Sequence, residues 1–250
     1  MKILIIGDRH VGGYGLAAGQ LSFVGHFIRQ INKTGRTVSV EAYAHSTLTA
    51  VRTTLAQLPL ERYDLIVMQA GKGCLDHPAG IGSLFINSSD NYTALSDDLI
   101  LPKFLQPISV VKPQPVLEKV RERAQLLMLK SMALLGRFPR LATVSRELTS
   151  LLTVLRPHRH KVILLTPFPH SDSNQQWLRQ QGKTLFMHSQ VRQSFSVFDT
   201  DLIVRSREEY FLATQPGYLN AIGHELIGRA LFDYYLAAPT IVAIHPIRRT

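Results

Sequence analysis

The chain has 250 residues, of which 45% are hydrophobic, and this is enough for one domain with a sizeable core or at most two domains. Its net charge of +10 predicts attraction to anions, but no nucleic-acid-binding motif accompanies the charge, so a generally basic surface is the favoured interpretation. The single cysteine, Cys74, excludes an internal disulfide, and no apolar run is long enough to span a membrane. Because no signal-peptide core precedes Gly7, we expect a cytoplasmic protein.

Strands and helices are predicted to alternate along the chain. The first part has strand signals at 3–6, 38–44 and 64–69, and helical spacing at 16–32 and 47–58. Prolines and glycines interrupt 75–115, which predicts an extended loop region. Beyond it, helical spacing appears at 116–135, 141–155, 175–181, 187–194 and 220–236, and strand signals at 161–166 and 196–199. This order predicts a three-layer α/β/α fold with a mostly parallel sheet.

In such sheets, binding and catalytic sites lie beyond the carboxyl ends of the strands. Four segments are therefore the candidate site: three strand ends and the loop that enters the last helix. They are 7–9 (Gly-Asp-Arg), 44–46 (Ala-His-Ser), 71–74 (Gly-Lys-Gly-Cys) and 215–220.

These four segments resemble the four sequence motifs of the SGNH (GDSL-type) hydrolase superfamily, and they occur in the same order along the chain. The matching segments are IIGDR, YAHST, YDLIVMQAGKG and QPGYLNAIGHELIGRAL. In the family, the first strand ends in a Gly-Asp-Ser nucleophile turn, the second supplies an oxyanion-hole glycine and the third a Gly-x-Asn. An Asp-x-x-His pair precedes the last helix. The resemblance implies a flavodoxin-like five-stranded sheet and one domain over 1–250, with a loop and helical insertion at about 77–158.

The resemblance also implies an ester hydrolase, yet other residues stand at the positions of the family's catalytic residues in this chain. The nucleophile, asparagine, base and acid positions fall on Arg9, Gly73, Tyr218 and Gln215, and the glycine expected at 44–46 is missing. The residues that remain as scaffold are Gly7, Asp8, Gly71, Asn220, Gly223 and His224. A permanently protonated arginine is neither a nucleophile nor a base, and a tyrosine is a poor base at neutral pH. Triad members act as a unit, so the substitutions indicate a pseudoenzyme that has lost ester hydrolysis.

Two hypotheses on function follow. The first is a non-catalytic protein of this fold that binds a small anionic or acylated ligand, or a partner. The second is an active acyl hydrolase with a non-standard site, in which Cys74 or Ser46 is the nucleophile and His10 or His45 the base. A lone cysteine at a strand end is more often a small buried hydrophobe, and neighbouring side chains on a strand point apart, so the first hypothesis is favoured.

Arg9 and Lys72 stand at neighbouring strand ends, where a guanidinium offers a fork for a carboxylate, phosphate or sulfate. Alternatively, Arg9 pairs with Asp8 or with a carboxylate in 76–98 and plugs the former site. The residues leave both interpretations open.

No metal and no cofactor are expected, because the histidines lack ligand spacing. The helix expected at 116–135 is basic and rich in leucine. Such a helix can lie on a membrane surface, but the favoured interpretation places its leucines on the core and its charges in water. Nothing in the sequence determines the oligomeric state.

Overall fold

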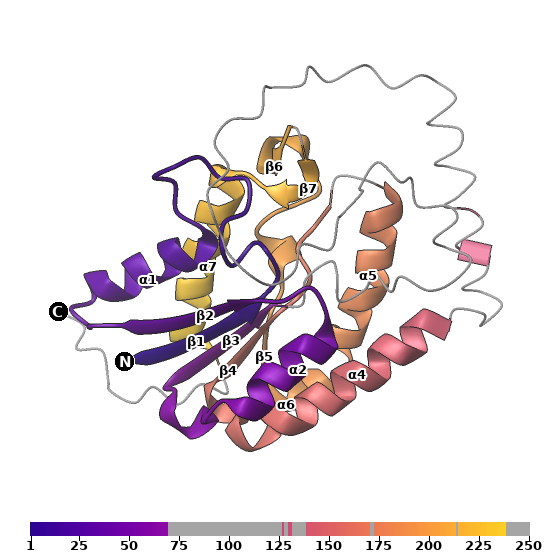
Figure 1. Cartoon of the computed structure of the whole chain (residues 1–250). Helices are drawn as coiled ribbons and strands as arrows, with labels where there is room; N and C mark the ends of the chain where they lie inside the picture. The colour runs from indigo at the N-terminus through magenta and orange to yellow at the C-terminus, as the bar shows by residue number, and fades with distance from the viewer. Residues whose placement is uncertain (70–126, 128–129, 132–138, 171–172, 214, 239–250) are drawn as a thin grey trace.

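The computed structural model describes residues 1–69, 127, 130–131, 139–170, 173–213 and 215–238 (Figure 1). Its centre is a five-stranded sheet with the order β2-β1-β3-β4-β5. Every neighbouring pair in this sheet is parallel. The strands are β1 (Lys2–Gly7), β2 (Ser39–Ala44), β3 (Leu65–Gln69), β4 (Val162–Leu165) and β5 (Ser196–Phe198). The predicted α/β class and the flavodoxin-like strand order are confirmed.

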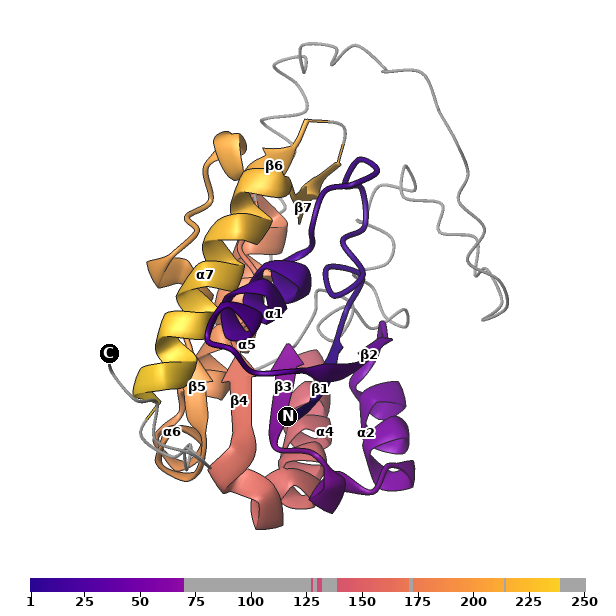
Figure 2. The same cartoon turned by 90° about the vertical axis from the view of Figure 1, so that its left-hand side faces the viewer.

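Helices cover both faces of the sheet, as Figures 1 and 2 show, with α1 and α7 on one face and α2 and α4 on the other. The helices are α1 (Phe23–Lys33), α2 (Leu48–Gln57), α4 (Pro139–Leu155), α5 (Ser173–Met187), α6 (Ser189–Ser194) and α7 (Ala221–Ala237). Short 3₁₀ turns lie at η1 (Leu60–Arg62), η4 (Arg156–Lys161), η5 (Thr200–Leu202) and η6 (Glu208–Tyr210). A small hairpin, β6 (Phe211–Leu212) with β7 (Gln215–Leu219), precedes α7.

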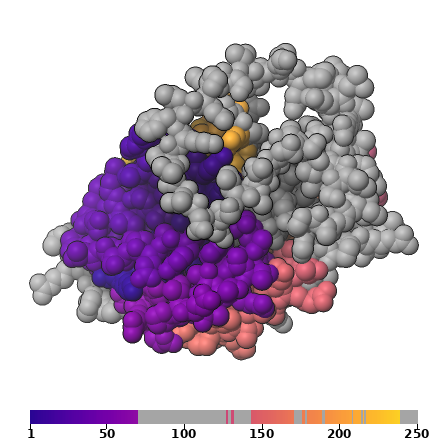
Figure 3. Space-filling model, in the orientation of Figure 1, coloured from indigo at the N-terminus to yellow at the C-terminus, as the bar shows by residue number. Residues whose placement is uncertain are grey.

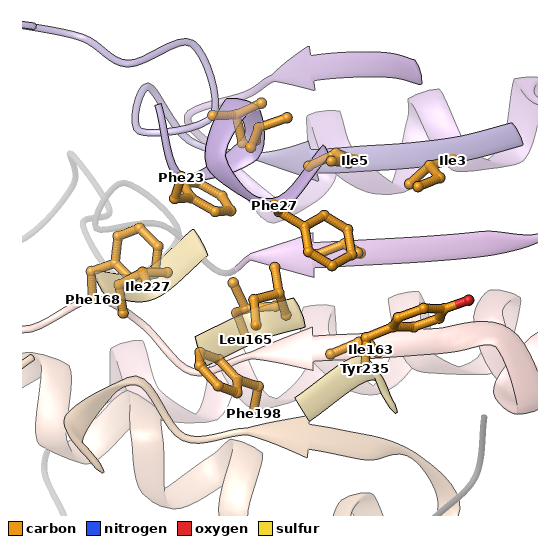
Figure 4. Close-up of a cluster of buried hydrophobic side chains, with 14 of the residues drawn as sticks. Ile3, Ile5, Phe23, Phe27, Ile163, Leu165, Phe168, Phe198, Ile227 and Tyr235 are labelled. Carbon is orange, nitrogen blue, oxygen red and sulfur yellow. The ribbon is translucent and has the colours of Figure 1, made fainter. Parts of the chain in front are cut away.

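Side chains alternate along the strands and so supply both hydrophobic layers. Ile3 and Ile5 of β1 face the layer beneath α1 and α7, whereas Leu4 and Ile6 face the layer beneath α2 and α4. Figure 4 shows the first of these layers, in which Phe23, Phe27, Ile227 and Tyr235 of the two helices meet Ile163 and Leu165 of β4. Burial on both faces explains why β1, β3 and β4 are continuous apolar runs.

Helices α1 and α7 approach each other closely at Gly228. A Cβ on that residue would lie 2.6 Å from the carbonyl oxygen of Phe23 and 2.5 Å from the Cβ of His26. Only glycine fits between the two backbones at this point.

Helix α1 begins later than the spacing over 16–32 predicts. Gly13, Gly15 and Gly19 have φ between 69° and 84°, which is the left-handed region, so the chain before Ser22 cannot continue a helix. Ser22 caps the helix by accepting a hydrogen bond from the backbone N–H of Gly25. The segment 9–22 is therefore a loop above the carboxyl end of β1.

Helix α4 belongs to the packed core, although the insertion expected at about 77–158 includes its residues. Val144, Leu148 and Leu151 are buried in the layer that α2 also covers. Residues 70–126 and 132–138 lie outside the described part, as does most of the basic helix expected at 116–135.

In the orientation of Figure 3, the N-terminal segments form a continuous surface that borders α4. Within the described ranges, no helix combines the length and hydropathy needed to cross a bilayer.

Candidate functional site

The turn after β1 is tied to the end of β3. The backbone N–H of Asp8 donates to Oε1 of Gln69 at 2.8 Å. A Cβ at Gly7 would lie 2.5 Å from that same oxygen and 2.7 Å from Val11, so the close approach requires glycine. The buried Asp8 is thereby fixed at the carboxyl edge of the sheet.

Asp8 pairs with His10 in a buried carboxylate–imidazole dyad. Oδ1 of Asp8 lies 2.7 Å from Nδ1 of His10 and also accepts from the backbone N–H of His10 at 2.9 Å. Burial by itself would raise the pKa of Asp8, but the charge of His10, the hydrogen bonds from His10 and that from Gln69 outweigh burial and lower this pKa to about 2. The ionised carboxylate fixes the proton of the imidazole on Nδ1.

Aromatic rings connect this dyad to Arg9 at the surface. The Tyr218 ring lies 5.2 Å from the His10 ring, and the Tyr14 ring lies 4.7 Å from Tyr218. The Arg9 guanidinium is exposed and stands 5.3 Å from the centre of the Tyr14 ring, within range of a cation–π contact. The structure therefore brings Arg9 and Tyr218, which the resemblance aligns with the nucleophile and base positions, to the same edge of the sheet.

The segment entering α7 keeps the scaffold of the family motif. Asn220 caps α7 by accepting from the N–H of Gly223 at 3.0 Å, and its amide donates to the carbonyls of Glu209 and Phe211. His224 is fully buried, and its Nδ1 accepts from the backbone N–H of Phe23 at 3.0 Å. Burial lowers the pKa of His224 to about 3, so this imidazole is neutral and serves the packing of α7 against α1.

The hairpin before α7 carries the two residues that the resemblance aligns with the acid and the base. Gln215 is exposed at the start of β7, and Tyr218 is half-buried. Between them, Gly217 lies against His170 of the loop after β4, because a Cβ there would be 2.7 Å from Nε2 of His170. A histidine is thus present beside the base segment, but it comes from another strand end.

The second strand end has a structural role in the described part. The backbone N–H of His45 donates to the carbonyl of Gly7 at 2.7 Å, and its Nε2 lies 2.7 Å from the hydroxyl of Thr54 on α2. His45 therefore links β2, β1 and α2, while Ser46 beside it is exposed. Gly71, Lys72, Gly73 and Cys74 lie outside the described residues.

Tyr14 and His170 were not identified from the sequence as members of the site, and His224 was identified only as scaffold of the family motif. Tyr14 follows two glycines in the loop after β1, and its position over Tyr218 depends on contacts between distant segments. No group of three metal-ligating side chains exists within the part of the chain that the structure describes.

Comparisons of sequence and of structure give different results. No protein-family model matches the chain, and no curated protein matches it in sequence. Solved structures do match, including a lipase/acylhydrolase from Enterococcus faecalis at 16% identity and a TM-score of 0.56, over 97% of this chain and 99% of that one.

Two further matches cover nearly the whole of both chains. A member of the lipolytic protein G-D-S-L family from Veillonella parvula has 10% identity and a TM-score of 0.53, over 94% of this chain and 98% of that one. A catalytic mutant of an acetylxylan esterase from Geobacillus stearothermophilus has 13% identity and a TM-score of 0.56, over 97% and 96%. The chain has the fold of the SGNH (GDSL-type) hydrolases, as its four motifs predicted.

Proposed function

We propose that the protein uses the SGNH hydrolase fold to bind a small anionic or acylated molecule and no longer hydrolyses esters. The observation that carries this proposal is the exposed Arg9 guanidinium, which stands over the Tyr14 ring at the position where the family has its nucleophile.

The replaced residues support the loss of hydrolysis. Position 9 holds a guanidinium instead of a hydroxyl, and position 218 holds a phenol whose ring packs between Tyr14 and His10. A serine esterase needs a nucleophile and a base in contact, and the loss of either costs several orders of magnitude in rate.

The chemistry of Arg9 and its neighbours supports an anionic ligand with an apolar part. A guanidinium presents parallel N–H donors that match a carboxylate or phosphate. The rings of Tyr14 and Tyr218 lie next to it and offer apolar faces to an acyl or aromatic group. The net charge of +10 raises the local concentration of anions around the whole molecule.

Thermal melts with and without phosphate or sulfate test this proposal. A ligand that binds only the folded chain raises its free energy of unfolding by RT ln(1 + [L]/Kd), where [L] is the free ligand concentration. We expect anion-dependent stabilisation of the wild type that is lost in Arg9→Ser and retained in Arg52→Ser, whose arginine is exposed on α2. Equal stabilisation of all three proteins would show that the anion acts on the general surface charge.

The second candidate function is the acyl hydrolase with a non-standard site, and the Asp8–His10 dyad is the observation that favours it. Carboxylate and imidazole are 2.7 Å apart, as in the base half of a catalytic triad. Cys74 or Ser46 would then supply the nucleophile, while the His45 ring is engaged with Thr54. Turnover of p-nitrophenyl acetate that disappears in Cys74→Ala or Ser46→Ala would favour this function over the first.

A further inference from the structure

Two buried imidazoles lie next to each other behind Tyr218. His10, on the turn after β1, is 3% exposed, and His224, on α7, is fully buried; their ring centres are 6.0 Å apart. In each ring Nδ1 is engaged, with Asp8 in one case and with the backbone N–H of Phe23 in the other. Nε2 of each ring is buried and lacks a hydrogen-bond partner among the described residues.

The partners of Nδ1 give the two rings opposite tautomers. Nδ1 of His224 accepts a hydrogen bond, so the single proton of this neutral ring is on Nε2. Nδ1 of His10 donates to the ionised Asp8, so a neutral His10 has a lone pair on Nε2. When His10 is neutral, the adjacent rings therefore present one buried acceptor and one buried donor.

Each of these nitrogens would be costly to leave unsatisfied in the interior. An oxygen about 2.9 Å from each Nε2 would lie about 4 Å from each ring centre, so two rings with centres 6.0 Å apart can share it with a bent angle at the oxygen. A single oxygen that accepts from one ring and donates to the other satisfies both nitrogens at once.

We propose that Nε2 of His10 and Nε2 of His224 together form a buried site for one hydroxyl group. The hydroxyl accepts from His224 and donates to His10, and it belongs either to a water molecule or to an alcohol group of a bound ligand. Phe168 packs edge-on against His10 at 4.9 Å and Phe23 stacks on His224, so apolar rings border the site. This inference does not depend on the binding of an anion by Arg9.

The site has a chemical consequence. A hydroxyl that donates to an imidazole backed by a carboxylate is in the position of a triad nucleophile relative to its base. The other titratable groups that act on the pair are Asp8, beside His10, His26, which acts on His224, and the Tyr218 phenol, whose ring contacts His10. The base half of an acyl-transfer site, Asp8 with His10, therefore lies in the turn after β1, with a bound hydroxyl in place of a serine.

Histidine-ring NMR on the intact ¹⁵N-labelled protein at pH 7 tests the tautomers without any substitution. We expect His10 to carry its proton on Nδ1 and His224 on Nε2, and the ring N–H of His224 to be protected from exchange. The exposed His188 is the internal control, and its ring N–H should exchange too fast to be observed. A proton on Nδ1 of His224, or protons on both nitrogens of His10, would overturn the proposal.

Cross-relaxation from the Hε2 proton of His224 then identifies the source of the hydroxyl. A contact with water alone supports a bound water, and a contact with the methylene protons of added ethanol supports a site that accepts ligand hydroxyls. The expected tautomers without a contact to either would overturn the site, whatever the outcome of the anion melts with Arg9→Ser.

Discussion

Replacing Asp8 with asparagine tests the charge of the buried dyad. Asparagine keeps the size of the side chain and an oxygen that can accept from His10, so the substitution mainly removes the negative charge. In the folded chain the pKa of Asp8 is about 2, against an ordinary value of 3.8. One pKa unit corresponds to about 1.4 kcal/mol, so the ionised carboxylate stabilises the folded chain by about 2–3 kcal/mol at neutral pH.

The direction of the pH dependence follows from the lowered pKa of Asp8. The stabilisation is complete well above 3.8 and is lost as the pH falls toward about 2, where the carboxylate of the folded chain takes up its proton. The difference in unfolding free energy between the wild type and Asp8→Asn should therefore be largest at neutral pH and should narrow below about pH 4.

Urea denaturation at a series of pH values between 7 and about 3 measures this difference. Glu209→Gln is the control, because its carboxylate belongs to an exposed pair with Arg207 and contributes little to stability. A difference that stays constant with pH, or no difference at pH 7, would refute the role of the ionised Asp8 in holding the turn.

Three further substitutions test the scaffold and the lost chemistry. Gly228→Ala should lower the free energy of unfolding, measured by urea denaturation, by about 1–3 kcal/mol, because the new Cβ meets the backbone of α1. Gly12→Ala is the control and should be nearly neutral, because the atom nearest to its new Cβ is 3.8 Å away. Equal effects of the two substitutions would contradict the close packing of α1 and α7. Asn220→Ala should cost about 1–2 kcal/mol through the loss of the α7 cap, and an unchanged midpoint would contradict that role. Arg9→Ser should not gain turnover of p-nitrophenyl esters, because no histidine occupies the base position; a gain would show that a base is already in reach.

The architecture could be predicted from local patterns because the buried strands are continuous apolar runs. The runs at 3–6, 64–69 and 161–166 overlap β1, β3 and β4. A short, continuous apolar run is typical of a strand that is buried on both faces of a parallel sheet. The start of α1 could not be predicted in this way. At Gly15 the reason is a contact distant in sequence, since the side chain of Leu212 on β6 fills the space where a Cβ of this left-handed glycine would lie.

Some features of the candidate site could likewise be predicted from the sequence, and others could not. The resemblance predicted that Arg9, Lys72 and Tyr218 converge on one crevice. In the structure, Arg9 and Tyr218 each contact the Tyr14 ring, whereas Lys72 lies outside the described residues. The resemblance marked His224 as scaffold, but its hydrogen-bond partner could not be predicted, because it is the backbone of Phe23, 201 residues earlier in the chain. The Asp8–His10 pair is local, but its significance depends on burial, which the short pattern Asp-x-His does not reveal.

Turnover of p-nitrophenyl acetate by the purified wild-type protein tests the loss of ester hydrolysis most directly. The resemblance aligns an arginine with the nucleophile position and a tyrosine with the base position. The rate of the wild type should therefore equal the rate of buffer alone and the rate of Arg9→Ser at the same protein concentration. A rate well above buffer that is retained in Arg9→Ser and abolished in Cys74→Ala or Ser46→Ala would contradict the proposed loss of activity and would establish a hydrolase with a relocated nucleophile.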